Sequence, residues 1–277
     1  MTGVQQRVDA QPDEALRARV RATWSAGDFG RIAVGFESGA ADFITQLAVK
    51  QGEDVLDVAC GTGNLTLPAA RAGARVTGLD IAPAVIAQLK DRAAAEGLAV
   101  DAREGDAEAL PFADASFDTV VTMFGAMFAG HPQQAADELV RVTRPGGRIA
   151  MANWTPEGFI GNMLKVIVGY VPPAPGVPSV LLWGNPKVVE ERLGAGLTDL
   201  RFERRKMVLA YPFGPEHTVE LFRTWYGPTV GAFAALDEAK QRGLFADLVR
   251  LWTEHNTASP NATRIESEFL AVLGIRA

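Results

Sequence analysis

Short β-branched runs alternate with alanine-rich segments between residues 54 and 153. Parallel strands that are covered on both faces read as apolar runs, and the crossover between two of them is usually a helix. The alternation therefore predicts a doubly wound α/β sheet. The expected strands are 55–58, 75–79, 100–104, 119–123 and 148–153, and the expected helices between them are 65–71, 83–96 and 133–142.

The residues before this core predict a helical cap. Pro12 can occupy the first position of a helix. Leu16, Val20 and Trp24 then recur every four residues, so they share one face of that helix. With a second short helix over 41–49, residues 1–50 are expected to cover the sheet that follows.

The regular alternation stops after residue 153. Residues 154–198 carry a proline run from Val171 to Pro178 and indicate an inserted, largely helical region on the substrate side. The rest of the chain predicts a strand at 199–211, helices at 215–226 and 237–255, and a last strand at 265–273. We expect one interleaved domain made of four segments, namely 1–50, 51–153, 154–198 and 199–277.

Composition excludes several classes of protein. The chain has 27 Lys and Arg against 33 Asp and Glu, a net charge of −6, where a general nucleic-acid binder would carry the opposite sign. Residues 1–11 lack the apolar segment of a signal peptide, and no apolar run approaches the ~20 residues of a membrane span. The single cysteine, Cys60, fits a reducing, cytoplasmic setting, and no Cys/His cluster predicts a metal site. The oligomeric state is not indicated.

The most informative stretch joins the first strand to its helix through the glycine turn Cys60-Gly61-Thr62-Gly63. Ligands of open α/β sheets bind outside the carboxyl ends of the strands, and glycines there let the backbone approach them closely. Asp80 ends the second strand, where a carboxylate can accept both hydroxyls of an adenosine ribose. Asp106 follows the third strand and can accept from the exocyclic amine of adenine. Three loops thus outline an adenosine.

The first strand helps to choose between a dinucleotide and S-adenosylmethionine. Asp57 would repel a pyrophosphate, whereas it would pair well with the amino group of a methionine moiety. Thr66 stands where a dinucleotide fingerprint requires a third glycine or alanine. The charge and the spacing both favour S-adenosylmethionine.

At these residues the sequence resembles the class I S-adenosylmethionine-dependent methyltransferases, within the group that includes ubiquinone- and menaquinone-biosynthesis-type enzymes. The resemblance spans roughly residues 50–153 and implies their Rossmann-like, seven-stranded sheet. It departs from the family at Ala59, where the first glycine often stands. The matching segments are Val-Leu-Asp-Val-Ala-Cys-Gly-Thr-Gly at 55–63, Gly-Leu-Asp at 78–80, Gly-Asp-Ala-Glu-Ala-Leu-Pro-Phe at 105–112, Ser-Phe-Asp-Thr-Val at 116–120, and Leu-Val-Arg-Val-Thr-Arg-Pro-Gly-Gly at 139–147.

The resemblance implies a role for each matching position. Asp57 would hold the methionine amino group, directly or through water, and Asp80 the ribose hydroxyls. Asp106 would accept from the adenine amine, while the backbone of Ala107 would donate to the ring. The full set of expected cofactor residues is Asp57, Ala59, Gly61, Thr62, Gly63, Asp80, Ile81, Asp106, Ala107 and Met123.

The implied reaction moves a methyl group from S-adenosylmethionine to a small-molecule acceptor by in-line displacement and leaves S-adenosylhomocysteine. A general base is needed only for a protonated acceptor; His131 is the main candidate, His217 is a second one, and the sequence leaves the choice open. Aromatic residues that could line an acceptor pocket, although such residues are as often core, are Phe124, Trp154, Trp183 and Trp225. Trp24 and Phe29 are candidates to close over the cofactor from the N-terminal side.

Three other functions remain open from the sequence. A nucleic-acid methyltransferase would show a basic face, and modifiers of base amino groups carry an Asn/Asp-Pro-Pro-aromatic motif where this chain has Met123-Phe124-Gly125-Ala126. A protein of this fold could instead transfer an aminopropyl group or bind the cofactor without methylating. An NAD-dependent oxidoreductase is disfavoured by Asp57 and Thr66.

Overall fold

The computed structural model describes residues 14–173 and 177–277. Pro12 and the centre of the proline run, residues 174–176, lie outside this described part. A seven-stranded sheet forms the centre, with the strand order β3-β2-β1-β4-β5-β7-β6. Its strands are β1 (Asp54–Val58), β2 (Arg75–Asp80), β3 (Val100–Glu104), β4 (Phe117–Met123), β5 (Thr143–Trp154), β6 (Leu197–Tyr211) and β7 (Thr263–Arg276).

The first five strands are parallel, and the chain order reverses between β1 and β4. β7 runs antiparallel to both of its neighbours, β5 and β6. This confirms the expected α/β fold and all five core strands. β5 begins at Thr143, five residues before the expected start at Arg148, because it continues directly from the preceding helix and makes one early pair with Phe117.

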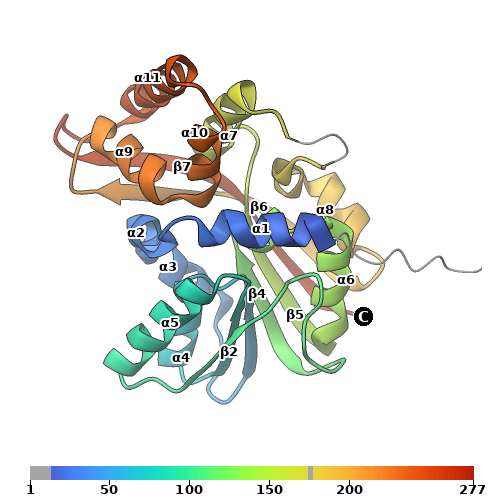
Figure 1. Cartoon of the computed structure of the whole chain (residues 1–277). Coiled ribbons are helices and arrows are strands. Elements are labelled where there is room, and N and C mark those ends of the chain that lie inside the picture. Colours follow the sequence, from blue (N-terminus) through green and yellow to red (C-terminus); the bar gives the residue numbers. More distant parts are fainter. Residues whose placement is uncertain (1–13, 174–176) are drawn as a thin grey trace, which may run out of the picture.

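Helices cover the sheet and its carboxyl edge in distinct groups (Figure 1). α4 (Thr66–Arg71) and α5 (Pro83–Ala95) contact β2 and β3, while α6 (Pro132–Val142) contacts β4 and β5. At the N-terminal side lie α1 (Glu14–Ser25), α2 (Phe29–Ala33), η1 (Val34–Phe36) and α3 (Glu37–Leu47), and η2 (Ala126–Phe128) follows β4. The second helix expected at 41–49 is thus α3, which starts four residues earlier and ends two residues earlier.

The segment expected as an insertion is helical as predicted. It contains α7 (Phe159–Tyr170), η3 (Val180–Gly184) and α8 (Pro186–Leu193), and its last two residues belong to β6. After β6 come α9 (Pro215–Trp225), α10 (Gly227–Ala234) and α11 (Glu238–His255). No sequence pattern had predicted α10. In Figure 1, α7, α9, α10 and α11 form a layer above the sheet, and α1 runs across between this layer and the strands.

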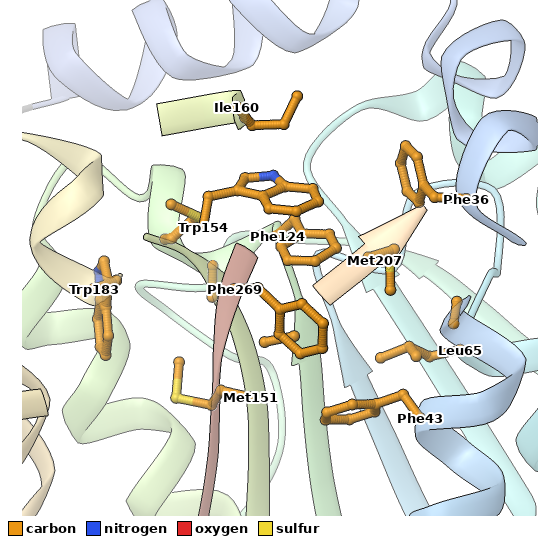
Figure 2. Close-up of a cluster of buried hydrophobic side chains, with 14 of the residues drawn as sticks. Phe36, Phe43, Leu65, Phe124, Met151, Trp154, Ile160, Trp183, Met207 and Phe269 are labelled. Carbon is orange, nitrogen blue, oxygen red and sulfur yellow. The ribbon is translucent and has the colours of Figure 1, made fainter. Parts of the chain in front are cut away.

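The core continues from the sheet into this upper layer. Figure 2 shows the indole of Trp154 lying flat on the ring of Phe124, with Phe269 packed nearby. The two stacked ring centroids are 3.5 Å apart at an interplanar angle of 7°, and Phe269 meets Phe124 edge-on. Such contacts add to the free energy of simple area burial. Within residues 14–173 and 177–277, no helix has the length and apolar character needed to cross a bilayer.

Candidate active site

A pocket opens where the carboxyl ends of β1, β2 and β4 meet the loop that follows β3, and α1 covers it. This is the position at which open α/β sheets bind ligands. Its lining residues are Arg17, Val20, Trp24, Phe29, Ala59, Gly61, Leu79, Asp80, Ile81, Ala82, Val85, Gly105, Asp106, Ala107, Glu108, Met123, Phe124, Gly125, Ala126, Phe128 and Ala129.

The glycine turn brings the backbone to the pocket because several of its residues adopt left-handed conformations. Gly61 has φ +53° and Gly63 has φ +92°, and a Cβ on Gly63 would overlap the side chain of Leu89. Ala59 has φ +56°, a left-handed conformation that favours glycine. Ala59 and Gly61 line the pocket, whereas Thr62 and Gly63 are not among its lining residues.

Asp80 connects the second strand to the glycine turn. One carboxylate oxygen accepts the backbone N–H of Gly61 at 2.9 Å, and the other accepts the N–H of Ala82 at the same distance. Burial raises the pKa of this carboxyl, while its backbone hydrogen bonds oppose the rise. The side chain lines the pocket, so its remaining lone pairs can accept the hydroxyls of a ligand.

Asp57 does not line the pocket, contrary to the simplest form of the sequence expectation. Its side chain is 1% exposed and accepts the hydroxyl of Thr66 at 2.6 Å, behind the turn. Burial raises the pKa of Asp57 to about 7. The carboxyl therefore ties the end of β1 to the first residue of α4, and Thr66 is its partner.

Two further carboxylates lie at the loop after β3. Asp106 accepts the backbone N–H of Glu108 at 2.9 Å, and its other oxygen lies 3.3 Å from Nε of Arg17. Glu108 accepts the backbone N–H of His131 at 2.8 Å and lies 2.7 Å from Nδ1 of its ring. Although burial opposes it, the hydrogen bonds from His131 and Arg17 hold the pKa of Glu108 below its usual value.

The position of His131 argues against the role expected of it. Its ring is engaged by Glu108, two residues from Asp106, and His131 is not among the residues that line the pocket. The expected site of methyl transfer is next to Met123 and Phe124, in the loop of another strand. We therefore do not retain His131 as a general base.

The four candidate acceptor residues fall into different places. Phe124 lines the pocket, with φ +57°. Trp154 lies behind Phe124 in the core, and Trp183 is 1% exposed under the guanidinium of Arg192. Trp225 is covered by Arg31, 4.6 Å from its ring centroid. None of the three tryptophans lines the pocket, because each is used in packing.

Trp24 and Phe29 do line the pocket, as the sequence suggested, but several other lining residues were missed. Val20 belongs to the spacing that includes Trp24, but that spacing did not show what its face covers. Arg17 lies on the same face and was not part of the predicted pattern. Glu108 lies in the matched segment 105–112, so its proximity to Asp106 was available as a signal. Other missed lining residues lie close to the ends of the predicted strands; they include Leu79, Ala82, Val85 and Gly105.

Arg92 of α5 holds the glycine turn from behind. Its guanidinium donates to the carbonyl oxygen of Thr62 at 2.8 Å and to Oδ1 of Asn64 at 3.3 Å. It also pairs with Glu37 at 2.7 Å, so α3, α5 and the turn are joined at one point. These bonds fix the backbone that the pocket presents.

Replacing this arginine should weaken ligand binding without touching the pocket. An Arg92→Met variant keeps the aliphatic stem but loses every donor to the turn, so we expect about fivefold weaker binding of S-adenosylhomocysteine. Calorimetric titration measures this. Lys90→Met, an exposed change on the same helix, is the control and should bind like the wild type; equal affinities in the two variants would contradict the role of Arg92.

The charge of the lining selects among ligands. Three carboxylates, Asp80, Asp106 and Glu108, face one guanidinium, that of Arg17, among the described residues that line the pocket. Such a surface disfavours a pyrophosphate and favours a cationic ligand without phosphate. Apolar groups from Met123, Phe124 and other residues make up most of the remaining wall. A nucleoside attached to a sulfonium amino acid fits this donor and acceptor set.

Comparison with known proteins agrees with this description. Residues 56–151 match the family described as methyltransferase domain. The uncharacterized protein Rv1405c of Mycobacterium tuberculosis is 40% identical over 231 residues, 83% of this chain and 84% of the relative. Demethylmenaquinone methyltransferase of Thermus thermophilus is 39% identical over 131 residues, which are 46% of this chain and 58% of that protein.

Solved structures share the fold at low sequence identity. The YcgJ protein of Bacillus subtilis superposes with a TM-score of 0.58 at 17% identity, over 86% of this chain and 98% of that one. A SAM-dependent methyltransferase of Thermotoga maritima gives a TM-score of 0.50 at 16% identity, over 90% and 93%. With the matched domain, the fold and the relatives in agreement, the chain belongs to the class I S-adenosylmethionine-dependent methyltransferases.

Proposed function

We propose that this protein transfers the methyl group of S-adenosylmethionine to a small-molecule acceptor and releases S-adenosylhomocysteine. The observation that carries the proposal is the acidic pocket at the carboxyl ends of β1, β2 and β4, with Asp80 and Asp106 in its wall. The similarity to a relative named demethylmenaquinone methyltransferase supports a small organic acceptor.

Different lining residues would bind different parts of the cofactor. Asp80 would accept the ribose hydroxyls, and Asp106 the exocyclic amine of adenine, with Ile81 and Ala107 beside the ring. The methionine end would extend past Ala59 and Gly61 of the turn. The buried carboxyl of Asp57 lies behind that turn and, when ionised, would attract the amino group from there without direct contact.

The chemistry needs positioning more than acid or base assistance from the protein. When bound, S-adenosylmethionine supplies a methyl carbon on a sulfonium, which a nucleophile can displace in line. Met123 and Phe124 would hold the acceptor side of the pocket, since Met123 ends β4 and Phe124 follows it directly. Trp24 and Phe29 would exclude water from it. Fixed geometry of this kind can supply much of a rate enhancement.

Thermal stabilisation tests the proposal, because a ligand that binds only the folded state raises the melting temperature. We expect S-adenosylmethionine and S-adenosylhomocysteine to raise it and NAD and NADP to leave it unchanged. A shift with NAD or NADP alone would instead make the protein a dehydrogenase candidate. Formation of S-adenosylhomocysteine with a panel of amines, phenols and thiols then identifies the acceptor.

A further inference from the structure

The helix α1 forms the roof of the pocket while none of its own residues is buried. Arg17, Val20 and Trp24 line the pocket from one face of this helix, and Arg19 points outward and is exposed. Leu16 packs on Gly130, which leaves no room there for a Cβ. Because no residue of α1 is buried, the helix loses little buried surface when it moves and can open as a unit, since local stability follows local burial.

Charge pairs fasten the first turns of this roof to the adenosine end of the pocket. Nε of Arg17 lies 3.3 Å from a carboxylate oxygen of Asp106 and 3.3 Å from one of Glu108. Its Nη2 also donates to the carbonyl oxygen of Glu108 at 3.4 Å. One turn later, Arg21 pairs with Glu104 at the end of β3.

The pairs made by Arg17 are largely removed from solvent. The side chain of Glu108 is 3% exposed, that of Arg17 18% and that of Asp106 23%. Removing the cation would leave the neighbouring carboxylates of Asp106 and Glu108 without their guanidinium partner in a half-buried site. Repulsion between like charges at such a site is weakly screened.

The other end of α1 is held by the upper helical layer. The N–H of Asp28 donates to the carbonyl oxygen of Trp225 at 3.1 Å, and Gly27 and Gly227 each sit against backbone too closely for a side chain. The Trp24 ring meets Tyr226 at a centroid distance of 5.8 Å. The helix is therefore anchored at its C-terminal end and fastened by salt bridges at its N-terminal half.

We infer that Arg17 is a positioning residue for cofactor binding, which acts through Asp106 and Glu108 and fastens α1 as a lid over the adenosine. The inference rests on the proposed function, since it assigns Asp106 to the adenine amine. Arg17 holds the Asp106 carboxylate in place for that amine, and the closed helix keeps the bound nucleoside from leaving. Cofactor exchange then requires the pairs of Arg17 to break.

Three variants test the inference by titration with S-adenosylhomocysteine. Arg17→Met keeps an unbranched apolar stem but removes the charge and the donors, and we expect about tenfold weaker binding. Arg17→Lys restores one cation and should recover part of the loss, which a purely structural role of the side chain would not predict. Arg19→Met makes the same change on the outer face of α1 and should bind like the wild type.

Limited trypsin digestion gives a second measurement that needs no ligand. Cleavage after Arg21, followed by mass spectrometry, should be about fivefold faster in Arg17→Met than in Arg19→Met, because the unfastened helix opens more often. If wild-type protein binds S-adenosylhomocysteine but both variants behave alike in titration and digestion, Arg17 has no such role and the proposed function stands. If the wild type binds none of this ligand, the proposed function fails first and the inference with it.

Discussion

An Asp80→Ala variant is expected to bind S-adenosylhomocysteine roughly 100-fold more weakly than the wild type, a loss of about 2.7 kcal/mol. Two ribose hydroxyls would lose their charged acceptor in a buried site, where hydrogen bonds to charged groups contribute most. The change also leaves the N–H groups of Gly61 and Ala82 without the carboxylate that they bind, which loosens the glycine turn. Both effects weaken binding.

The measurement is calorimetric titration, with the melting temperature recorded to show that the variant folds. Asp101→Ala removes an exposed carboxylate on β3 outside the pocket and serves as the matched control. We expect the control to bind within twofold of the wild type. An Asp80→Ala affinity within threefold of wild type would remove Asp80 from the site and with it the adenosine position proposed above.

The second large effect concerns stability and its dependence on pH. Burial raises the pKa of Asp57 to about 7, above its value in the unfolded chain. Between these two pKa values the folded state holds a proton that the unfolded state has lost, so this group lowers stability as the pH rises from about 4 to 7. Above pH 7 the full cost of the buried charge is present.

An Asp57→Asn variant removes that cost and can still accept the hydroxyl of Thr66. We expect it to be more stable than the wild type at pH 8 by on the order of 2 kcal/mol, with the difference vanishing near pH 4. Urea unfolding of the ligand-free protein at several pH values measures this. Asp42→Asn, an exposed change on α3, should show no such trend; a destabilised Asp57→Asn at pH 8 would contradict the assignment of a buried, costly charge.

Much of the fold follows from local patterns, because buried parallel strands must be apolar and must be joined by helices. The five core strands were predicted for this reason. The early start of β5 was not, since Pro145, Gly146 and Gly147 read as a turn after a helix. Pairing of Thr143 with Phe117 overrides that local preference. The antiparallel insertion of β7 between β5 and β6 depends on long-range pairing that no local pattern encodes.

Some residues of the candidate site could be predicted from the sequence and others could not. Residues that directly follow a strand, such as Asp80 and Asp106, could be placed at the pocket because the topology gathers strand ends at one edge. Asp57 stands inside β1 three residues before the turn, and its orientation toward Thr66 depends on how α4 packs. The positions of Trp183 and Arg17 could not be predicted either. Trp183 is buried in the core and Arg17 lines the pocket, and composition alone does not indicate which residue faces a ligand.

A crystal structure of the protein grown with S-adenosylhomocysteine tests the central claim most directly. The account predicts the ligand beneath α1, with both ribose hydroxyls within hydrogen-bonding distance of Asp80 and the adenine amine at Asp106. Clear density for the ligand at another place, or a nucleoside turned so that Asp80 contacts no hydroxyl, would contradict it.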